Sequence, residues 1–193
     1  MTTETSAGRG RRVLGEMRAT DLAVYRAIAA SPTPTLDRTL RRLSHAADRS
    51  RLWFAIAGVL AVVPGRSRRG AVLGVVSIGV ASAAANLVAK RVTVRVRPDR
   101  GAAAVPIGRH VRMPMSTSFP SGHAASAFAF AAAVGGEMPW LSLPLHVVAT
   151  AVAYSRVHTG VHYPGDTLAG ATIGAASAAT ATYVMNRLWP SPS

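Results

Sequence analysis

The sequence contains no cysteine, and only 16% of its 193 residues carry a charge. The absence of cysteine excludes a disulfide framework, a catalytic thiolate and a zinc–thiolate site. Aromatic residues make up only 6% of the chain and are not interleaved with the basic residues as in nucleic-acid binders. Acids are also scarce, with 8 Asp and Glu against 22 Lys and Arg. This net charge of +14, in a chain too poor in charge for an ordinary soluble domain, suits an anionic membrane surface.

Long uncharged stretches are the main feature of what is present. Residues 70–89 carry no charge, and as a helix they would span the ~30 Å hydrocarbon core of a bilayer. A buried helix of a soluble protein is the alternative. Small residues at 170, 174 and 177 share one helical face, which lets helices approach closely in a membrane. We therefore predict an all-α integral membrane bundle of about five spans (five or six). The four further apolar stretches are 52–65, 124–135, 144–154 and 167–189.

The N-terminal region differs in composition from the rest. Its first 18 residues are small, polar and Arg-rich, which predicts a flexible basic tail. Ser31-Pro32-Thr33-Pro34 then interrupts the chain, so residues 21–30 and 36–51 are expected to form separate helices. Apolar residues at helical spacing opposite arginines favour helices at the lipid interface, and a soluble helical hairpin is the alternative. The predicted division is a tail at 1–18, amphipathic helices at 19–51 and a membrane-embedded core at 52–189.

Three polar clusters lie beside the apolar stretches, where charged residues are costly and often functional. The first is KRVTVRVRP, residues 90–98. If the preceding helix continues through it, Lys90 and Arg97 lie on one face two turns apart and can reach one anion. Alternatively, these basic residues only fix the topology of the span.

The second cluster is Phe119-Pro120-Ser121-Gly122-His123, just before an apolar stretch. Proline, serine and glycine predict a helix start whose free N–H groups bind an anion. His123, in the first turn, would face the same anion. A capped helix with an incidental histidine is the alternative.

The third cluster is SRVHTGVHYPGD, residues 155–166. Asp166 follows His162 by four residues, so its carboxylate can reach one imidazole nitrogen and leave the other as a nucleophile. Arg156 ends the preceding apolar stretch. His158 has no comparable partner in the sequence, and we expect it to line the site or the lipid interface.

In this order, K-x-x-x-x-x-x-R-P, P-S-G-H and S-R-x-x-x-x-x-H-x-x-x-D resemble the motifs of the type 2 phosphatidic acid phosphatase superfamily. They cover residues 90–166, and no motif position is missing. That superfamily includes soluble acid phosphatases and vanadate-binding haloperoxidases as well as membrane enzymes. The uncharged stretches favour the membrane lipid-phosphatase branch.

The resemblance implies a metal-independent phosphatase with no cofactor, in which a cationic cluster neutralises the phosphate. His162 would attack phosphorus to form a phosphohistidine, and Asp166 would hold the resulting imidazolium. His123 would protonate the departing alkoxide and then activate water. The implied phosphate-binding residues are Lys90, Arg97, Ser121, Gly122 and Arg156.

The distribution of basic residues predicts the orientation. With five spans, residues 1–51, 90–120 and 156–165 share one side, which carries ten, seven and one Lys or Arg, against four on the other side. The positive-inside rule places the crowded side, and with it the active site, in the cytoplasm, so we expect a multi-pass protein of the inner (plasma) membrane.

Lipid phosphates made on the cytoplasmic face are the expected substrates: phosphatidic acid, phosphatidylglycerol phosphate or a polyprenyl-linked phosphosugar. The Ala- and Arg-rich composition is typical of high-GC bacteria such as actinobacteria. In these organisms a family member acts on decaprenylphosphoryl-5-phosphoribose, which joins the candidates. The sequence does not select among these lipids.

A non-catalytic basic membrane adaptor, which binds anionic lipid or a partner enzyme, is the second hypothesis. It explains the N-terminal charge but gives no role to His123, His162 and Asp166. No nucleic-acid partner is expected. A homo-oligomer and a complex with a lipid-biosynthesis enzyme both stay open.

Overall fold

The computed structural model describes residues 6–89 and 94–188, so Lys90 lies outside the described residues. Within those ranges the chain is helical and has no strand, as the sequence predicts. The helices are α1 (Ser6–Ala30), α2 (Pro34–Ala46), α3 (Arg51–Ala61), α4 (Arg66–Ala83), α6 (Gly122–Glu137), α7 (Pro139–His158) and α8 (Pro164–Leu188). Three shorter helical segments are η1 (Asp48–Ser50), η2 (Ala84–Ala89) and η3 (Ile107–Arg109).

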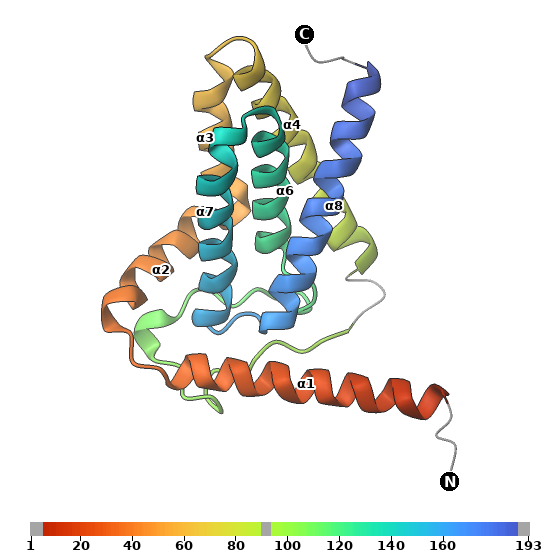
Figure 1. The fold of residues 1–193 in the computed structure, drawn as a ribbon. Helices are drawn as coiled ribbons and strands as arrows, with labels where there is room; N and C mark the ends of the chain where they lie inside the picture. The colour runs from red at the N-terminus through yellow and green to blue at the C-terminus, as the bar shows by residue number, and fades with distance from the viewer. Residues whose placement is uncertain (1–5, 90–93, 189–193) are drawn as a thin grey trace.

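Helices α3, α4, α6, α7 and α8 run side by side as a bundle, and α1 lies across one end of it (Figure 1). Helix α6 is central and packs against α4, α7 and α8. The turns α3–α4 and α6–α7 lie at the end far from α1, whereas the long segment 94–121 and the α7–α8 loop lie beside α1 (Figure 1). We call the end beside α1 the loop end. The described segments α1, 94–120 and 159–163, which belong to the three regions predicted to share one side, therefore lie at the same end of the bundle.

The N-terminal part differs from the prediction in its secondary structure. Residues 6–18, expected as part of a flexible tail, form the first half of α1. Their Arg, Ala, Leu, Glu and Met side chains favour helix, and an ion pair between Arg12 and Glu16 at 3.0 Å lies one turn along it. The break between α1 and α2 falls at residues 31–33, as the two prolines predict. The division of the chain into three domains stays a prediction.

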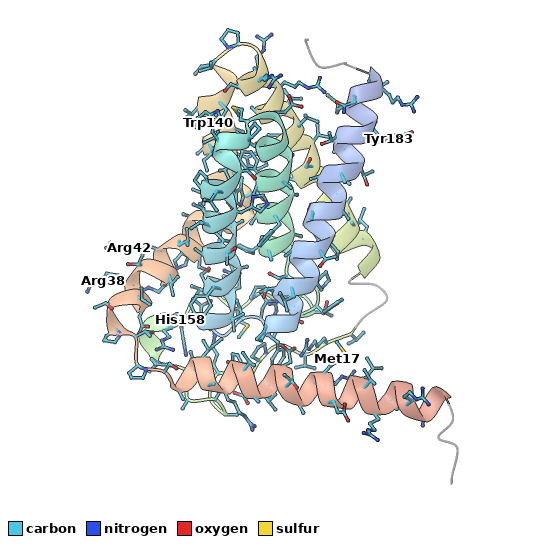
Figure 2. The ribbon with its side chains drawn as sticks, in the orientation of Figure 1. Met17, Arg38, Arg42, Trp140, His158 and Tyr183 are labelled. Atoms are coloured by element: carbon cyan, nitrogen blue, oxygen red, sulfur yellow. The ribbon has the colours of Figure 1, made fainter. Side chains whose placement is uncertain are left out.

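The second half of α1 is held against the bundle by its apolar side. Tyr25 and Ala29 are buried and cluster with Val105 and Val157. In its first half, by contrast, apolar side chains such as Met17 are exposed (Figure 2). Part of the apolar pattern read as an interfacial face therefore packs on the protein itself.

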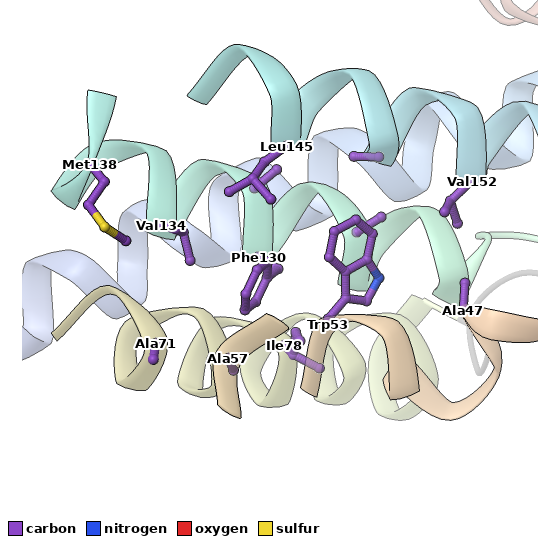
Figure 3. Close-up of a cluster of buried hydrophobic side chains, with 13 residues drawn as sticks. Ala47, Trp53, Ala57, Ala71, Ile78, Phe130, Val134, Met138, Leu145 and Val152 are labelled. Carbon is purple, nitrogen blue, oxygen red and sulfur yellow. The ribbon is translucent and has the colours of Figure 1, made fainter. Parts of the chain in front are cut away.

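The main core fills the space between α3, α4, α6 and α7 (Figure 3). Trp53 from α3 and Phe130 from α6 are 1% and 0% exposed, and their ring centroids lie 5.4 Å apart. Ile78 from α4 and Val152 from α7 complete the cluster. The two aromatic side chains are the largest apolar groups at this contact, since much of α6 is alanine.

Helix α8 approaches α6 closely through glycines. A side-chain carbon at Gly170 or Gly174 would overlap the carbonyl oxygen of Ser121 or Ala125 on the facing part of the chain. The stripe of small residues predicted from the sequence therefore serves close packing, and Ser177 on the same stripe is buried as well. This contact fixes where α8 begins, and so where Asp166 lies.

Two helical segments, Arg66–Leu87 and Pro164–Leu188, are long and apolar enough to cross a membrane. Apolar side chains are also exposed on the outer faces of the bundle, among them Val59, Leu143 and Leu168. Trp140 and Tyr183 are exposed near the end opposite α1 (Figure 2), as aromatic residues are at membrane–water interfaces. These features are those of a membrane protein.

Candidate active site

The three motif segments meet at the loop end of the bundle. Residues 94–99 are not helical, so the condition under which Lys90 and Arg97 would share one helical face is not met. Val94 and Val96 favour extended backbone, and Pro98 disfavours helix in the residue before it. The extended segment pairs with the next motif through a hydrogen bond from the Ser118 N–H to the Arg95 carbonyl, at 2.8 Å.

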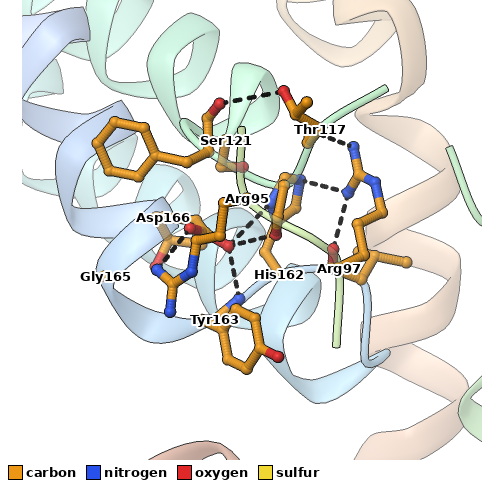
Figure 4. A network of polar contacts seen from close by, with 12 residues as sticks. Arg95, Arg97, Thr117, Ser121, His162, Tyr163, Gly165 and Asp166 are labelled. Atoms are coloured by element: carbon orange, nitrogen blue, oxygen red, sulfur yellow. Dashed lines mark hydrogen bonds and ion pairs between the residues drawn. The ribbon is translucent and has the colours of Figure 1, made fainter. Parts of the chain in front are cut away.

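His162 lies in the α7–α8 loop and is 3% exposed (Figure 4). Its Nδ1 faces Asp166 Oδ2 at 3.6 Å, and its Nε2 faces Arg97 Nη1 at 3.3 Å. The carboxylate favours a proton on Nδ1, which leaves the lone pair on Nε2. Burial lowers the pKa of His162 to about 4; Arg97 and Arg156 act in the same direction, and the nearby Asp166 carboxylate opposes it. The ring is therefore neutral at physiological pH, as a nucleophile must be.

Asp166, in the first turn of α8, is fully buried and surrounded by donors. Its Oδ1 pairs with Arg95 Nη1 at 2.9 Å, while its Oδ2 accepts from the Tyr163 N–H at 2.8 Å and from the Ser118 hydroxyl at 2.5 Å. These contacts fix the carboxylate behind His162 (Figure 4). The spacing of four residues between the two side chains correctly predicts their proximity.

Arg97 is held in place by backbone carbonyls. Its guanidinium donates to the carbonyls of Val161 at 2.7 Å, Ser116 at 2.8 Å and Thr117 at 3.1 Å. This clamp joins the segment 94–121 to the α7–α8 loop and sets the guanidinium beside the His162 ring (Figure 4).

His123 lies in the first turn of α6, as the sequence predicts, but its partner comes from elsewhere. Its Nε2 lies 2.8 Å from Asp48 Oδ1 in η1. Arg156, at the end of α7, is 2% exposed and donates to the Ser44 hydroxyl, and its Nη1 lies 3.9 Å from the same Asp48 oxygen. The motif residues His123 and Arg156 thus both contact the carboxylate of Asp48, a residue in the N-terminal part of the chain.

Ser121 is the N-cap of α6, and its hydroxyl accepts from the Ala124 N–H at 3.5 Å. The hydroxyl is buried within the helix start, and Gly122 is the residue of this pair that lines the pocket described next. The helix start expected from the sequence is therefore present, and its first residue, Gly122, is half-buried and lines the pocket. That this helix start binds an anion stays a prediction.

A pocket of about 240 Å³ opens at this point. Both imidazoles and Arg97 line it, so the structure brings together His123, His162, Arg97 and Gly122. Arg156 and Asp166 are buried and do not line it, but both contact His162: the Arg156 carbonyl accepts from its N–H at 3.2 Å, and the Asp166 carboxylate faces its ring. The remaining lining residues are Ala47, Arg49, Ser50, Ser82, Asn86, Pro114, Ser116 and Ser126.

Sequence reasoning missed Asp48, Ser44 and Arg95. A signal for Arg95 exists, because Val94 and Val96 alternate with Arg95 and Arg97, and in extended backbone both arginines share one side. His158, expected to line the site or the interface, does neither. It is 1% exposed, and its Nε2 contacts Asp37 of α2 at 2.9 Å, which makes it a buried link between α7 and α2.

A sequence profile of the PAP2 superfamily matches residues 70–190, more than half of the chain. The chain belongs to the PAP2 superfamily. Its curated relatives are named as phosphatases of lipid-linked phosphates, and the chain is a phosphatase, as predicted. A relative from Mycobacterium tuberculosis (strain ATCC 25618 / H37Rv), named decaprenylphosphoryl-5-phosphoribose phosphatase, is 39% identical over 142 residues, 74% of this chain and 76% of the relative.

Two solved structures share the fold of this PAP2 chain. LpxE from Aquifex aeolicus superposes with a TM-score of 0.68 and 23% identity, covering 84% of this chain and 94% of its own. A transmembrane PAP2-type phosphatidylglycerolphosphate phosphatase from Bacillus subtilis superposes with a TM-score of 0.68 and 21% identity, covering 90% and 88%. The bundle, with its α1 included in part, is thus the fold of PAP2 membrane phosphatases.

Proposed function

We propose that this PAP2 protein hydrolyses the phosphate monoester or diphosphate of a lipid or polyprenyl-linked substrate through a phosphohistidine on His162. The observation that carries the proposal is the pocket itself, in which two imidazoles and Arg97 face one space. An adaptor that only binds anionic lipid gives no reason for a buried, neutral imidazole backed by a carboxylate.

In the first step, the Nε2 lone pair of His162 forms a bond to phosphorus, and the bond from phosphorus to the lipid oxygen breaks. His123 gives the departing oxygen its proton. Asp166 stabilises the positive charge that develops on the His162 ring through Nδ1. Arg97, the N–H of Gly122 and, from behind, Arg156 balance the negative charge of the phosphoryl oxygens. We keep Lys90 in the phosphate-binding role expected from the motif, and we propose that Ser121, whose buried hydroxyl caps α6, contributes to phosphate binding by holding the helix start at Gly122.

In the second step, His123 takes a proton from water, the water oxygen bonds to phosphorus, and the bond to His162 breaks. Phosphate leaves, and both rings return to their starting forms. We propose that no metal takes part, because the arginines and the helix start supply the charge that a metal would otherwise neutralise. In the described part of the chain, no group of three or more His, Asp and Glu is gathered to hold a metal ion.

We propose a lipid-linked phosphosugar as the substrate class. The relative that is 39% identical over three quarters of both chains is named for decaprenylphosphoryl-5-phosphoribose. Serine and asparagine side chains at positions 50, 82, 86 and 126 line the pocket beside the imidazoles, and such groups suit sugar hydroxyls. Phosphatidic acid and phosphatidylglycerol phosphate are the competing substrates.

We propose that α3, α4, α6, α7 and α8 form the five membrane-embedded segments of a protein of the inner (plasma) membrane; α8 and the segment Arg66–Leu87 are long enough to cross the bilayer alone, and the 11-residue α3 enters it without crossing alone. The loop end then faces the cytoplasm by the positive-inside rule, with α1 and its arginines at the lipid headgroups. An oligomer or a complex with a lipid-biosynthesis enzyme stays a prediction.

A panel of substrates in mixed micelles tests the proposal. The panel holds phosphatidic acid, phosphatidylglycerol phosphate, prenyl mono- and diphosphates and a prenyl phosphoribose phosphate, and released phosphate is measured. We expect the prenyl phosphoribose phosphate to give the highest kcat/KM. His162→Ala should lose turnover of every substrate while it elutes as the wild type does in detergent. Wild-type phosphate release by this variant would refute the mechanism, and a preference for phosphatidic acid would refute only the substrate class.

A further inference from the structure

The segment η1 between α2 and α3 brings an N-terminal residue to the pocket. It lies outside residues 70–190, the part matched by the PAP2 profile. Arg49 and Ser50 line the pocket and have φ angles of 54° and 60°. This left-handed conformation is uncommon outside glycine, and two such residues in succession persist only where the surroundings hold them. The backbone of η1 is therefore held in one conformation, and this conformation fixes the position of Asp48, the residue just before Arg49.

Asp48 lies between two motif residues and a histidine of α2. Its Oδ1 contacts His123 Nε2 at 2.8 Å and Arg156 Nη1 at 3.9 Å, and its Oδ2 lies 3.5 Å from His45 Nδ1. The hydrogen bond to His123 lowers the pKa of the Asp48 carboxyl, with Arg156 and His45 acting in the same direction. The carboxylate is therefore ionised at neutral pH. Its side chain is 43% exposed, and contact with water also favours the charged form.

We propose that Asp48 is a positioning residue for His123, and that its carboxylate holds the imidazolium through Nε2 so that the other ring nitrogen serves the leaving group. The proposal rests on the proposed function, in which His123 is the general acid. The pocket then contains two imidazole–carboxylate pairs, with Asp166 behind His162 and Asp48 behind His123.

The proton balance is simple. The proton on the free ring nitrogen of His123 moves to the departing lipid oxygen in the first step. The ring is then neutral and keeps its Nε2 proton toward Asp48. The same free nitrogen takes a proton from water in the second step, which restores the imidazolium.

A carboxylate is needed here because the other charges around His123 are mainly positive. A positive ring among these cations is unfavourable unless an anion compensates. Among the described residues, 6–89 and 94–188, Asp48 is the one whose carboxylate contacts the His123 ring directly. The titratable and charged groups that face this pair are His45, Arg49, Arg97, Arg156 and His162.

The test compares Asp48→Asn and Asp48→Glu with the wild type, as full chains in detergent, on the panel substrate with the highest turnover. Without the carboxylate, fewer molecules carry the proton on His123, so kcat for Asp48→Asn should fall by about 10- to 100-fold. The basic limb of its kcat–pH profile should also move to lower pH. Asp48→Glu should restore part of both, and KM should change less than kcat.

Glu16→Gln is the matched control, because it removes one carboxylate from a surface ion pair on α1 far from the pocket. It should keep the wild-type profile. A basic limb that does not move in Asp48→Asn overturns the proposal. A lower KM with unchanged kcat also overturns it, because Asp48 would then be an anion that competes with the substrate phosphate.

His162→Ala, measured in the same assay, separates this proposal from the proposed function. If that variant retains turnover, the mechanism itself fails. If it is inactive while Asp48→Asn behaves like the wild type, only the role of Asp48 fails. Should Asp48→Asn not fold, the pH profile of Asp48→Glu decides, because a longer side chain displaces the carboxylate from Nε2 and should give an intermediate shift.

Discussion

Replacing Asp166 by asparagine is the sharpest structural test of the site. The carboxylate accepts on both oxygens, from Arg95 on one side and from Ser118 and Tyr163 on the other. An amide group must turn its NH₂ toward one of these sides, where it meets the Arg95 guanidinium or the Tyr163 N–H. One buried donor is then unpaired, which should cost about 1–3 kcal/mol of unfolding free energy. Arg95 adds little to that cost, because it is 26% exposed and keeps its ion pair with Asp21.

The effect on catalysis should be much larger than the effect on stability. Without the carboxylate, the Nδ1 proton of His162 is no longer favoured and the developing imidazolium has no partner. We expect kcat to fall by about 10²- to 10⁴-fold, the range found when an orienting carboxylate or a general acid is removed. Phosphate release from the best panel substrate measures kcat, and the thermal midpoint in detergent measures stability.

Asp21→Asn is the matched control. Asp21 pairs with the same Arg95 and accepts from the Gly165 N–H at 2.7 Å at the start of α8, but it does not contact His162. It should lose a similar amount of stability and keep kcat within about 10-fold of the wild type. If both variants lose kcat equally, or if Asp166→Asn keeps wild-type kcat, the orienting role of Asp166 is refuted.

Four further predictions concern pH, packing and inhibition. Because burial lowers the pKa of His162 to about 4, the nucleophile stays neutral as pH falls through 6.5, and the acid limb of kcat/KM should lie near pH 4; a limb near 6.5 would contradict this. The same lowered pKa means that stability is lost as pH falls from about 6.5 toward 4, because the unfolded chain binds the proton first, and pH-dependent thermal midpoints measure this. Gly174→Val should push α8 away from Ala125, lower stability by about 1–3 kcal/mol and reduce kcat, whereas Gly10→Val on α1, which meets no neighbour, should change neither. Orthovanadate should inhibit competitively and EDTA should leave turnover unchanged; strong EDTA inhibition would argue against a metal-free reaction.

The sequence predicted the helical class and several details within the motifs because local rules suffice for them, whereas the convergence of the three motifs was predicted from the family resemblance. Uncharged stretches give helices, a Pro-Ser-Gly start gives the terminus at His123, and a spacing of four residues brings Asp166 to His162. Lys90 lies outside the described residues, so its place at the pocket remains a prediction.

The missed contacts depend on how separate elements dock. Asp48 is 75 residues from His123, Ser44 is 112 from Arg156, and Arg95 is 71 from Asp166. No local pattern encodes such pairs, because they arise only when α2, η1 and the segment 94–121 dock against the bundle. A helix that continued to Arg97 would have placed Lys90 and Arg97 on one face, but the alternating valines and the following proline favour extended backbone there.

The most direct test of the account is to trap the phosphoenzyme. Wild type, His123→Ala and His162→Ala are mixed with ³²P-labelled substrate, quenched within milliseconds in alkali, and digested for peptide mapping. We predict an alkali-stable, acid-labile label on the peptide that contains His162, absent in His162→Ala. A label on another residue, or none while phosphate is released at the wild-type rate, would contradict the claim that His162 attacks phosphorus.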